Sequence, residues 1–146
     1  MKVLIVEDDS YKRDAVAAFI RRKYTSVDVE FRKSVQSAVE CVTNEDFDFV
    51  VLDMSLPSHD LESGGALSIP RLSGGVEVLF ELNYLKKTPK VIILTQYPEV
   101  EMSNELVPLL DVREFVAENY GVNIVDCVYF DFERSEWQDQ LDQGMS

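Results

Sequence analysis

Short apolar runs alternate with longer amphipathic segments along the whole chain. The first run, residues 2–6, is continuously apolar after its lysine, which is typical of a strand covered on both faces. Similar short runs predict strands over residues 26–31, 47–52, 90–94 and 123–130.

The segments between these runs have helical spacing. One helix is capped by Asp9 or Ser10 and reaches about Lys23, and a second is capped by Ser34 and reaches about Asn44. The remaining helical segments are residues 74–87, with Val76, Leu79, Phe80 and Leu82 facing inward, and residues 98–120 and 134–141. Pro108 is expected to divide residues 98–120 into two helical pieces, because proline disrupts a helix interior, and Gly121 is expected to end the second piece.

A strand followed by a helix, repeated five times, predicts an α/β fold with a doubly wound parallel sheet. The expected arrangement is the flavodoxin-like (βα)5 fold, with strand order 2-1-3-4-5 and helices on both faces of the sheet. We expect one domain over residues 1–146, without an output domain. A ligand site in such a fold lies at the carboxyl ends of the strands.

Composition narrows the classes of partner. The formal net charge of -13 disfavours direct binding to nucleic acid or to an anionic membrane. No apolar run approaches the roughly 20 residues of a membrane helix, so a cytoplasmic protein is expected. Cys41 and Cys127 are predicted to be reduced core residues, because they have no metal-ligand spacing and a disulfide is not expected.

Acidic residues follow two strands that are neighbours in the expected order. Glu7 and Asp8 come directly after the first strand, and Asp53 directly after the third. Carboxylates brought together in this way favour a hard cation such as Mg²⁺, which would let Asp53 act as a nucleophile toward phosphorus. Thr95 ends the fourth strand at the same edge, where its hydroxyl can donate to a phosphoryl oxygen.

Each of these residues also has an ordinary structural interpretation. An acid after a strand often caps the next helix, as Asp9 is expected to do, and a hydroxyl such as that of Thr95 often bonds to nearby backbone. The combination of an acid pair, a further acid and a hydroxyl after three particular strands is more specific than any one of them.

Three sequence runs resemble the response-regulator receiver domain of two-component signalling. They are LIVEDD at residues 4–9, VVLDMSLP at residues 50–57 and VIILT at residues 91–95. The resemblance implies a CheY-like signalling domain, not an enzyme, beyond catalysis of its own phosphorylation and dephosphorylation. The phosphoryl donor would be a histidine kinase or a phosphotransfer protein.

The resemblance also implies a role for each matching residue. Asp53 would be the phosphoacceptor, and Glu7 and Asp8 would bind Mg²⁺ together with Asp53 and the backbone carbonyl of Ser55. Thr95 would be the switch hydroxyl.

One family residue is missing. Receiver domains carry a lysine at the end of the fifth strand, which pairs with the phosphoryl group, but Phe130 and Asp131 stand there in this chain. Arg134 or Lys12 is a candidate substitute. Gln96 follows Thr95 where the family has a small residue, so it is expected to restrict access to the phosphate or to orient a water molecule.

Two segments, about 54–73 and 98–120, are longer than is usual in the family. Output is expected through protein contact at the face formed by residues 98–141, which would bind an unknown downstream protein or a second copy of the chain. His59, the single histidine, is expected to be an exposed loop residue.

Two other functions fit parts of the pattern. The first is a pseudo-receiver, an interaction module that works without phosphorylation and for which the missing lysine is the evidence. The second is a phosphatase with an aspartyl nucleophile, which needs an acid two residues after the nucleophile, where this chain has Ser55.

Overall fold

The computed structural model describes residues 1–59, 70–71 and 74–146, and its centre is a five-stranded parallel sheet. The strand order is β2-β1-β3-β6-β9, so the predicted order 2-1-3-4-5 is confirmed. The strands are β1 (Lys2–Val6), β2 (Asp28–Arg32), β3 (Phe49–Leu52), β6 (Lys90–Thr95) and β9 (Ile124–Tyr129).

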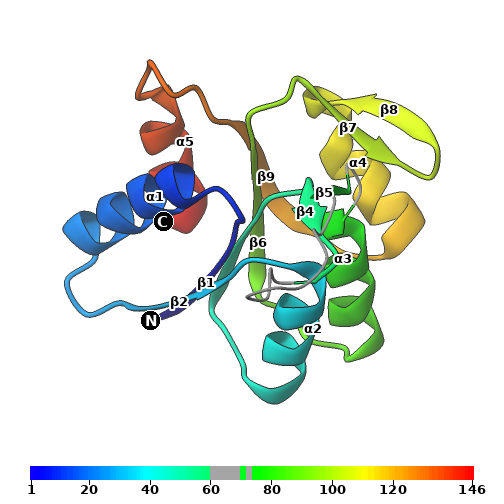
Figure 1. Cartoon of the computed structure of the whole chain (residues 1–146), viewed down its shortest axis with the longest axis horizontal. Coiled ribbons are helices and arrows are strands. Elements are labelled where there is room, and N and C mark those ends of the chain that lie inside the picture. Colours follow the sequence, from blue (N-terminus) through cyan, green and yellow to red (C-terminus); the bar gives the residue numbers. More distant parts are fainter. Residues whose placement is uncertain (60–69, 72–73) are drawn as a thin grey trace, which may run out of the picture.

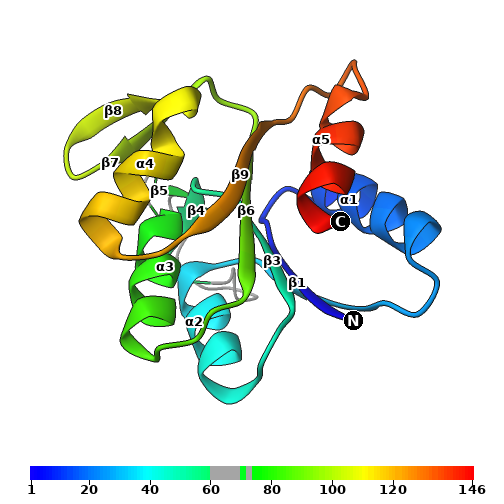
Figure 2. The same cartoon turned by 180° about the vertical axis from the view of Figure 1, so that it is seen from behind.

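Helices cover both faces of this sheet (Figures 1 and 2). On one face lie α1 (Ser10–Lys23) and α5 (Glu136–Met145). On the other lie α2 (Val35–Asn44), α3 (Gly74–Tyr84) and α4 (Leu109–Tyr120). The fold is therefore the predicted doubly wound α/β arrangement.

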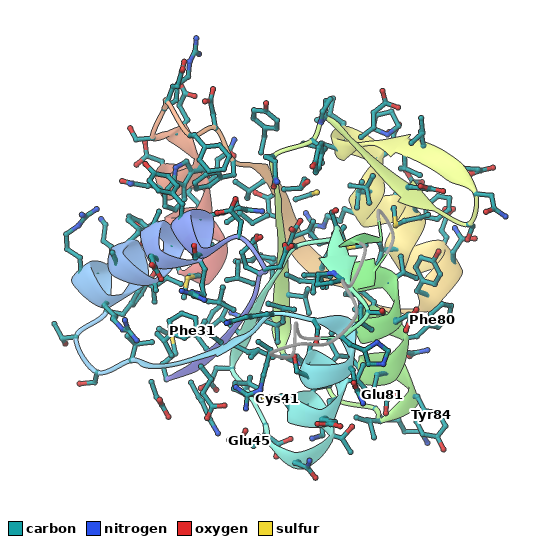
Figure 3. All side chains as sticks on the ribbon, viewed as in Figure 1. Phe31, Cys41, Glu45, Phe80, Glu81 and Tyr84 are labelled. Atoms are coloured by element: carbon teal, nitrogen blue, oxygen red, sulfur yellow. The ribbon has the colours of Figure 1, made fainter. Side chains whose placement is uncertain are left out.

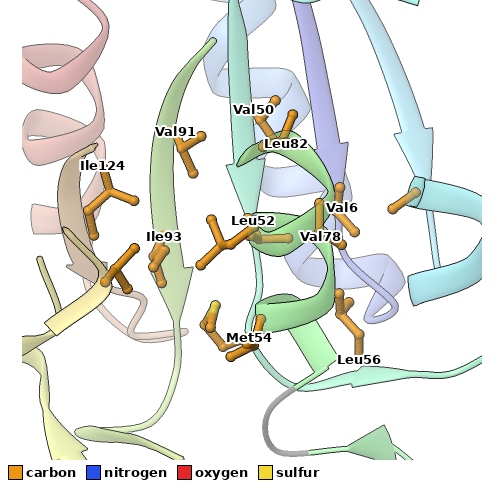
Figure 4. Packing of buried hydrophobic residues seen from close by; sticks show 14 of the residues in the cluster. Val6, Val50, Leu52, Met54, Leu56, Val78, Leu82, Val91, Ile93 and Ile124 are labelled. Atoms are coloured by element: carbon orange, nitrogen blue, oxygen red, sulfur yellow. The ribbon is translucent and has the colours of Figure 1, made fainter. Parts of the chain in front are cut away.

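Alternate residues of each strand enter separate cores on the two sides. Leu4, Val6 and Leu52 pack against α2, α3 and α4 (Figure 4), while Val3 and Ile5 pack against α1 and α5. Each such apolar side chain contributes about 1.5–3 kcal/mol when fully buried. Burial on both faces explains why the strands appear in the sequence as continuous apolar runs.

Helix boundaries follow the capping residues. The Asp9 side chain accepts a hydrogen bond from the Lys12 amide at the start of α1, and Ser34 forms a capping box with Ser37 at the start of α2. Gly121 ends α4 in the left-handed region, with φ of 67°. These three predicted caps are confirmed.

Residues 99–108 contradict the prediction of a helical piece before Pro108. They form an antiparallel hairpin of β7 (Glu99–Met102) and β8 (Glu105–Pro108). Val100, Met102 and Val107 are buried, which is a period of two rather than the helical period. The turn residues Ser103 and Asn104 have φ of 52° and 63°, as a two-residue hairpin turn requires.

Smaller corrections concern α3 and the cysteines. Phe80 was predicted to face inward, but it is 51% exposed at the surface (Figure 3). Its ring lies edge-on to Tyr120 of α4, with ring centroids 4.8 Å apart. The helix ends at Tyr84, before Lys86, which has a positive φ of 57°. Both cysteines are free as predicted; Cys41 is buried, but Cys127 is only partly buried.

The segment after Asp53 returns to α3 through a short ladder of β4 (Leu56–Pro57) and β5 (Pro70–Arg71). His59 is exposed, as predicted, and its ring contacts the Ser58 hydroxyl. Most of the predicted extension after Asp53, including Asp60 and Glu62, lies outside the described residues. Among the helices that the structure describes, none has the length and apolar character needed to cross a membrane.

Candidate functional site

The ends of β1 and β3 bring three acids to one point. The Glu7 amide donates to the Arg32 carbonyl, and the Asp53 amide donates to the Val6 carbonyl, both at 3.0 Å, so both residues continue the sheet hydrogen bonding. One carboxylate oxygen from each of Glu7, Asp8 and Asp53 lies within 4.8 Å of the others. Glu7 and Asp53 are buried and Asp8 is exposed, so the cluster opens on one side to solvent.

The chain after Asp53 is fixed to the core by apolar side chains. Met54 and Leu56 are fully buried beneath α3 (Figure 4). The first residues of α3 approach this segment closely: the Gly75 amide donates to the Met54 carbonyl at 3.0 Å. A Cβ on Gly75 would lie 2.8 Å from the Asp53 carbonyl oxygen, so only glycine fits without displacing the Asp53 segment.

The cluster contains a fully buried cation, the ammonium of Lys12. Its Nζ lies 2.6 Å from Glu7 Oε2 and 3.6 Å from Asp53 Oδ1. It also donates to the Leu94 carbonyl at 2.8 Å and to Gln96 Oε1 at 3.0 Å. The ammonium thus connects the acids after β1 and β3 to the end of β6.

The position of Lys12 follows from the local structure of α1. Asp9 caps the helix, which places Lys12 in its first turn. Helical side chains point back toward the amino terminus, so the Lys12 side chain enters the acidic cluster. Lys12 also belongs to the buried stripe that includes Val16 and Phe19. This helical spacing can be seen in the sequence, and it indicates that the Lys12 side chain faces the interior.

Thr95 lies at the same edge and is fully buried. Its Oγ1 accepts a hydrogen bond from the Tyr97 amide at 3.1 Å, and its backbone carbonyl accepts one from the Phe130 amide at 2.7 Å. The hydrogen bond from the Tyr97 amide is the ordinary structural role of a threonine at the end of a strand, and it needs no ligand. The hydroxyl proton of Thr95 is still available, since the hydroxyl accepts this bond.

Comparison with known proteins identifies the family. The family model described as response regulator receiver domain matches residues 3–120. A Detocs response regulatory protein, DtcB, from Vibrio alginolyticus is 34% identical over 136 residues, which cover 92% of this chain and 91% of that protein. The chain belongs to the response regulator receiver domain family. A second DtcB, from Enterobacter cloacae, is 25% identical over 146 residues, covering 97% of this chain and 95% of that protein.

Solved structures show the same fold. The response regulator TrrA from Thermotoga maritima, in complex with Mg²⁺ and BeF, matches with a TM-score of 0.62 at 17% identity and covers 98% of this chain and 97% of that one. The N-terminal domain of a response regulator/sensory box/GGDEF protein from Carboxydothermus hydrogenoformans matches with a TM-score of 0.63 at 19% identity, covering 97% and 89% of the two chains. Receiver domains are signalling domains, and the fold of this chain is theirs.

At the end of β9, where the sequence resemblance predicts a lysine, the chain has Phe130. Its side chain is buried, and its ring packs on Trp137 of α5 with centroids 5.0 Å apart. Arg134, one of the two candidate substitutes, lies at the surface beside Asp131 and Glu136. Of the two, only Lys12 reaches the acids.

The electrostatics of the receiver site favour an additional cation. Burial, followed by the charge of Asp53, raises the pKa of Glu7 to about 8, even though Lys12 lies beside it. Burial also raises the pKa of Asp53, and partial desolvation raises the pKa of Asp8, although its side chain is exposed on the open side of the cluster. The Lys12 ammonium lowers these pKa values, but one ammonium shared between two buried carboxylates compensates each only in part.

The residues present suit a hard divalent ion. Glu7, Asp8 and Asp53 carry three negative charges when ionised, and Lys12 offsets one, which leaves the two that a divalent cation neutralises. Their donors are oxygen atoms, which Mg²⁺ prefers, and the exposed Asp8 gives such an ion a path from solvent.

Proposed function

We propose that this receiver domain accepts a phosphoryl group on Asp53, with Mg²⁺ held by Glu7, Asp8, Asp53 and the backbone carbonyl of Ser55. The observation that carries the proposal is the convergence of three carboxylates and a buried ammonium around the side chain of Asp53. A bound Mg²⁺ would neutralise the acids and the incoming phosphate, so that the Asp53 carboxylate can approach the negatively charged phosphoryl group.

The chemical step is a phosphoryl transfer. A carboxylate oxygen of Asp53 forms a bond to phosphorus while the bond from phosphorus to the donor breaks, and the donor leaves with the electron pair. Asp53 is held for this step by its backbone bond to β1 and by the Ser55 amide, which donates to Oδ1 at 3.3 Å. Thr95 would donate its hydroxyl proton to a phosphoryl oxygen on the product.

The proposed donor is a histidine kinase or a phosphotransfer protein, and the proposed output is contact with another protein. A groove beside the site supports an output near residues 98–120. It is lined on one side by Met54, Ser55 and Thr95 and on the other by Val100 and Leu106 of the β7–β8 hairpin. The hairpin lies at the carboxyl end of the sheet (Figure 1). Phosphorylation of Asp53 or a movement of Thr95 would therefore alter the surface next to the hairpin.

The 34% identity to DtcB, which is named a response regulatory protein, supports a regulatory role of this kind. A second candidate function is a pseudo-receiver that binds partners without phosphorylation. The absence of a lysine on β9 favours it, as does the ion pair that Lys12 already makes with Glu7. The phosphatase alternative is disfavoured because Ser55 stands where that chemistry needs an acid.

Titration with beryllium fluoride, a phosphate mimic, separates the two candidates. We expect the emission of Trp137, the single tryptophan, to change when beryllium fluoride is added with Mg²⁺ and to stay unchanged without Mg²⁺. Asp53→Asn, which keeps the shape of the side chain, should abolish the response. An unchanged wild-type signal, together with no heat of binding for Mg²⁺ in calorimetry, would favour the pseudo-receiver.

A further inference from the structure

We propose that Lys12 supplies, from the first turn of α1, the ammonium that contacts the phosphoryl group on Asp53. It would take the role of the lysine that this chain lacks on β9. The inference rests on the proposed function, because it assigns a ligand to the phosphoryl group whose acceptor is Asp53. The cation that contacts the phosphoryl group would then come from the first helix, α1, and not from the last strand of the sheet, β9.

Distance and burial place the ammonium at the reacting group. Lys12 Nζ is 3.6 Å from Asp53 Oδ1, and the side chains of both residues are almost completely buried. The same Nζ lies 5.9 Å from the centroid of the Phe130 ring. Lys12 therefore approaches the strand position of the missing lysine, although its backbone belongs to a different element.

The contacts of Lys12 hold the ammonium in place and leave its charge available. An ammonium has three N–H donors. Two neutral oxygens, the Leu94 carbonyl and Gln96 Oε1, accept hydrogen bonds from it, and the remaining donor faces Glu7. With Glu7 bound to a metal ion, this donor would be free to bond to a phosphoryl oxygen.

The location of Lys12 is costly for a residue with only a structural role. A cation in the first turn of a helix lies at the positive end of the helix dipole, and a buried ammonium loses its hydration. An apolar residue would continue the stripe of Val16 and Ile20 without either cost. A contact between the Lys12 ammonium and the phosphoryl group would explain why a buried cation is present at this position.

A different role for Lys12 would be to replace Mg²⁺ altogether. The charge of the cluster argues against this, because one ammonium cannot offset three carboxylates when they are ionised. Loss of a cation beside the acids should not weaken Mg²⁺ binding on either role, so the phosphorylation rate of Lys12→Met separates the two. If Lys12 replaced the metal, phosphorylation would rise with Mg²⁺ binding; on our proposal phosphorylation falls.

The step to be measured is transfer from acetyl phosphate. A carboxylate oxygen of Asp53 bonds to phosphorus, the bond between phosphorus and the acetate oxygen breaks, and acetate leaves with the electron pair. The Lys12 ammonium donates a hydrogen bond to a transferring phosphoryl oxygen and keeps its proton. A charge-assisted hydrogen bond of this kind corresponds to a rate effect of about 10- to 100-fold.

The test compares Lys12→Met and Lys12→Arg with Lys23→Met as the matched control. Lys23 is at the other end of α1, pairs with Asp142 at the surface, and is half exposed. We expect Lys12→Met to bind Mg²⁺ at least as tightly as the wild type by calorimetry and to lose about 10- to 100-fold in phosphorylation rate at saturating Mg²⁺. Lys12→Arg should recover part of that rate, and Lys23→Met should behave as the wild type.

A transplanted lysine provides a second test. Phe130→Lys in the Lys12→Met background returns the ammonium to β9, and it should raise the phosphorylation rate above that of Lys12→Met alone. If Lys12→Met does not fold by circular dichroism, the Lys12→Arg rate decides: a loss equal to that of Asp53→Asn would overturn the proposal.

The results also separate this inference from the proposed function. A wild-type protein that takes no phosphoryl group would refute both. A wild-type protein that is phosphorylated, with Lys12→Met phosphorylated at the same rate and equally long-lived, would refute the role of Lys12 and leave Asp53 as the phosphoacceptor.

Discussion

The Lys12 Nζ lies 5.9 Å from the centroid of the Phe130 ring, beside the strand position where the sequence resemblance predicts a lysine. The cation comes from α1, and the strand position is filled by an aromatic ring. Phe130 in turn packs on Trp137 of α5, with ring centroids 5.0 Å apart. A continuous line of contacts therefore joins the acidic cluster to the last helix.

This line of contacts predicts an optical response that depends on Phe130. Phe130→Leu should reduce the change in Trp137 emission that beryllium fluoride and Mg²⁺ produce, because the ring that transmits the change is removed. Phosphorylation of Asp53 should persist, since the Phe130 side chain has no polar group that could bind the metal ion or a phosphoryl oxygen. A full fluorescence response in Phe130→Leu would show that the signal reaches Trp137 by another route.

The raised pKa of Glu7 predicts that the metal-free protein loses stability as the pH rises. The pKa is about 8 in the folded state against 4.5 for the free side chain, so the folded state keeps a proton that the unfolded state releases. The stabilisation is therefore complete below about pH 4.5 and is lost as the pH rises to about 8. Thermal unfolding in EDTA at several pH values measures it.

Glu7→Gln is the control for this pH dependence. It should flatten the loss of stability between these pH values, whereas repulsion from the overall charge of -13 would remain. Mg²⁺ should bind more tightly at higher pH, because it displaces the proton from Glu7. Affinity that is independent of pH would contradict the assignment of Glu7 as a ligand.

The contact between α3 and the Asp53 segment predicts a difference between two glycines. Gly75→Ala places a Cβ 2.8 Å from the Asp53 carbonyl oxygen and 2.9 Å from Met54 Cα. Both are backbone atoms, so relief of the clash requires a shift of the main chain. We expect a loss of about 1–3 kcal/mol in the free energy of unfolding, measured with denaturant.

Gly144→Ala is the matched control. Its nearest contact would be the end of the Ile92 side chain at 3.0 Å, with Val125 Cγ1 in ordinary contact at 3.6 Å, and alanine is favoured over glycine within a helix by about 1 kcal/mol. It should be neutral or stabilising. Equal losses at both positions would indicate that the close approach of α3 to Asp53 is not present in solution.

The hairpin at residues 99–108 predicts that a stronger turn sequence stabilises the protein. Asn104→Gly places glycine at a turn position with positive φ and leaves Ser103, whose hydroxyl lies 2.9 Å from the Tyr120 hydroxyl, unchanged, so we expect a gain of up to about 1 kcal/mol in unfolding free energy. In a helix the same glycine would cost about 1 kcal/mol. Destabilisation of this variant would therefore argue for the helical alternative.

The sequence was sufficient to predict the sheet order and the convergence of the acids. Buried strands appear as continuous apolar runs, and Glu7 and Asp53 directly follow two of them. The hairpin was missed because its buried residues, Val100, Met102 and Val107, are too few for their period to exclude a helix.

The location of Lys12 was harder to assign. The sequence indicated it only as one of two candidate cations, since charge alone does not separate it from Arg134. The distinguishing signal is its place on the buried stripe of α1, four residues before Val16 and one turn after the acids. The choice between the two cations also depends on the path of the chain after β9, which local pattern does not define.

Mass spectrometry of the intact protein can establish whether Asp53 accepts a phosphoryl group with the help of Mg²⁺. The protein is incubated with acetyl phosphate, with Mg²⁺ or with EDTA, and the modified residue is located in peptides after trapping of the acyl phosphate. We expect one added phosphoryl group, on Asp53, that requires Mg²⁺ and is absent in Asp53→Asn. No adduct on the wild-type protein, or an adduct that Asp53→Asn retains, would contradict it.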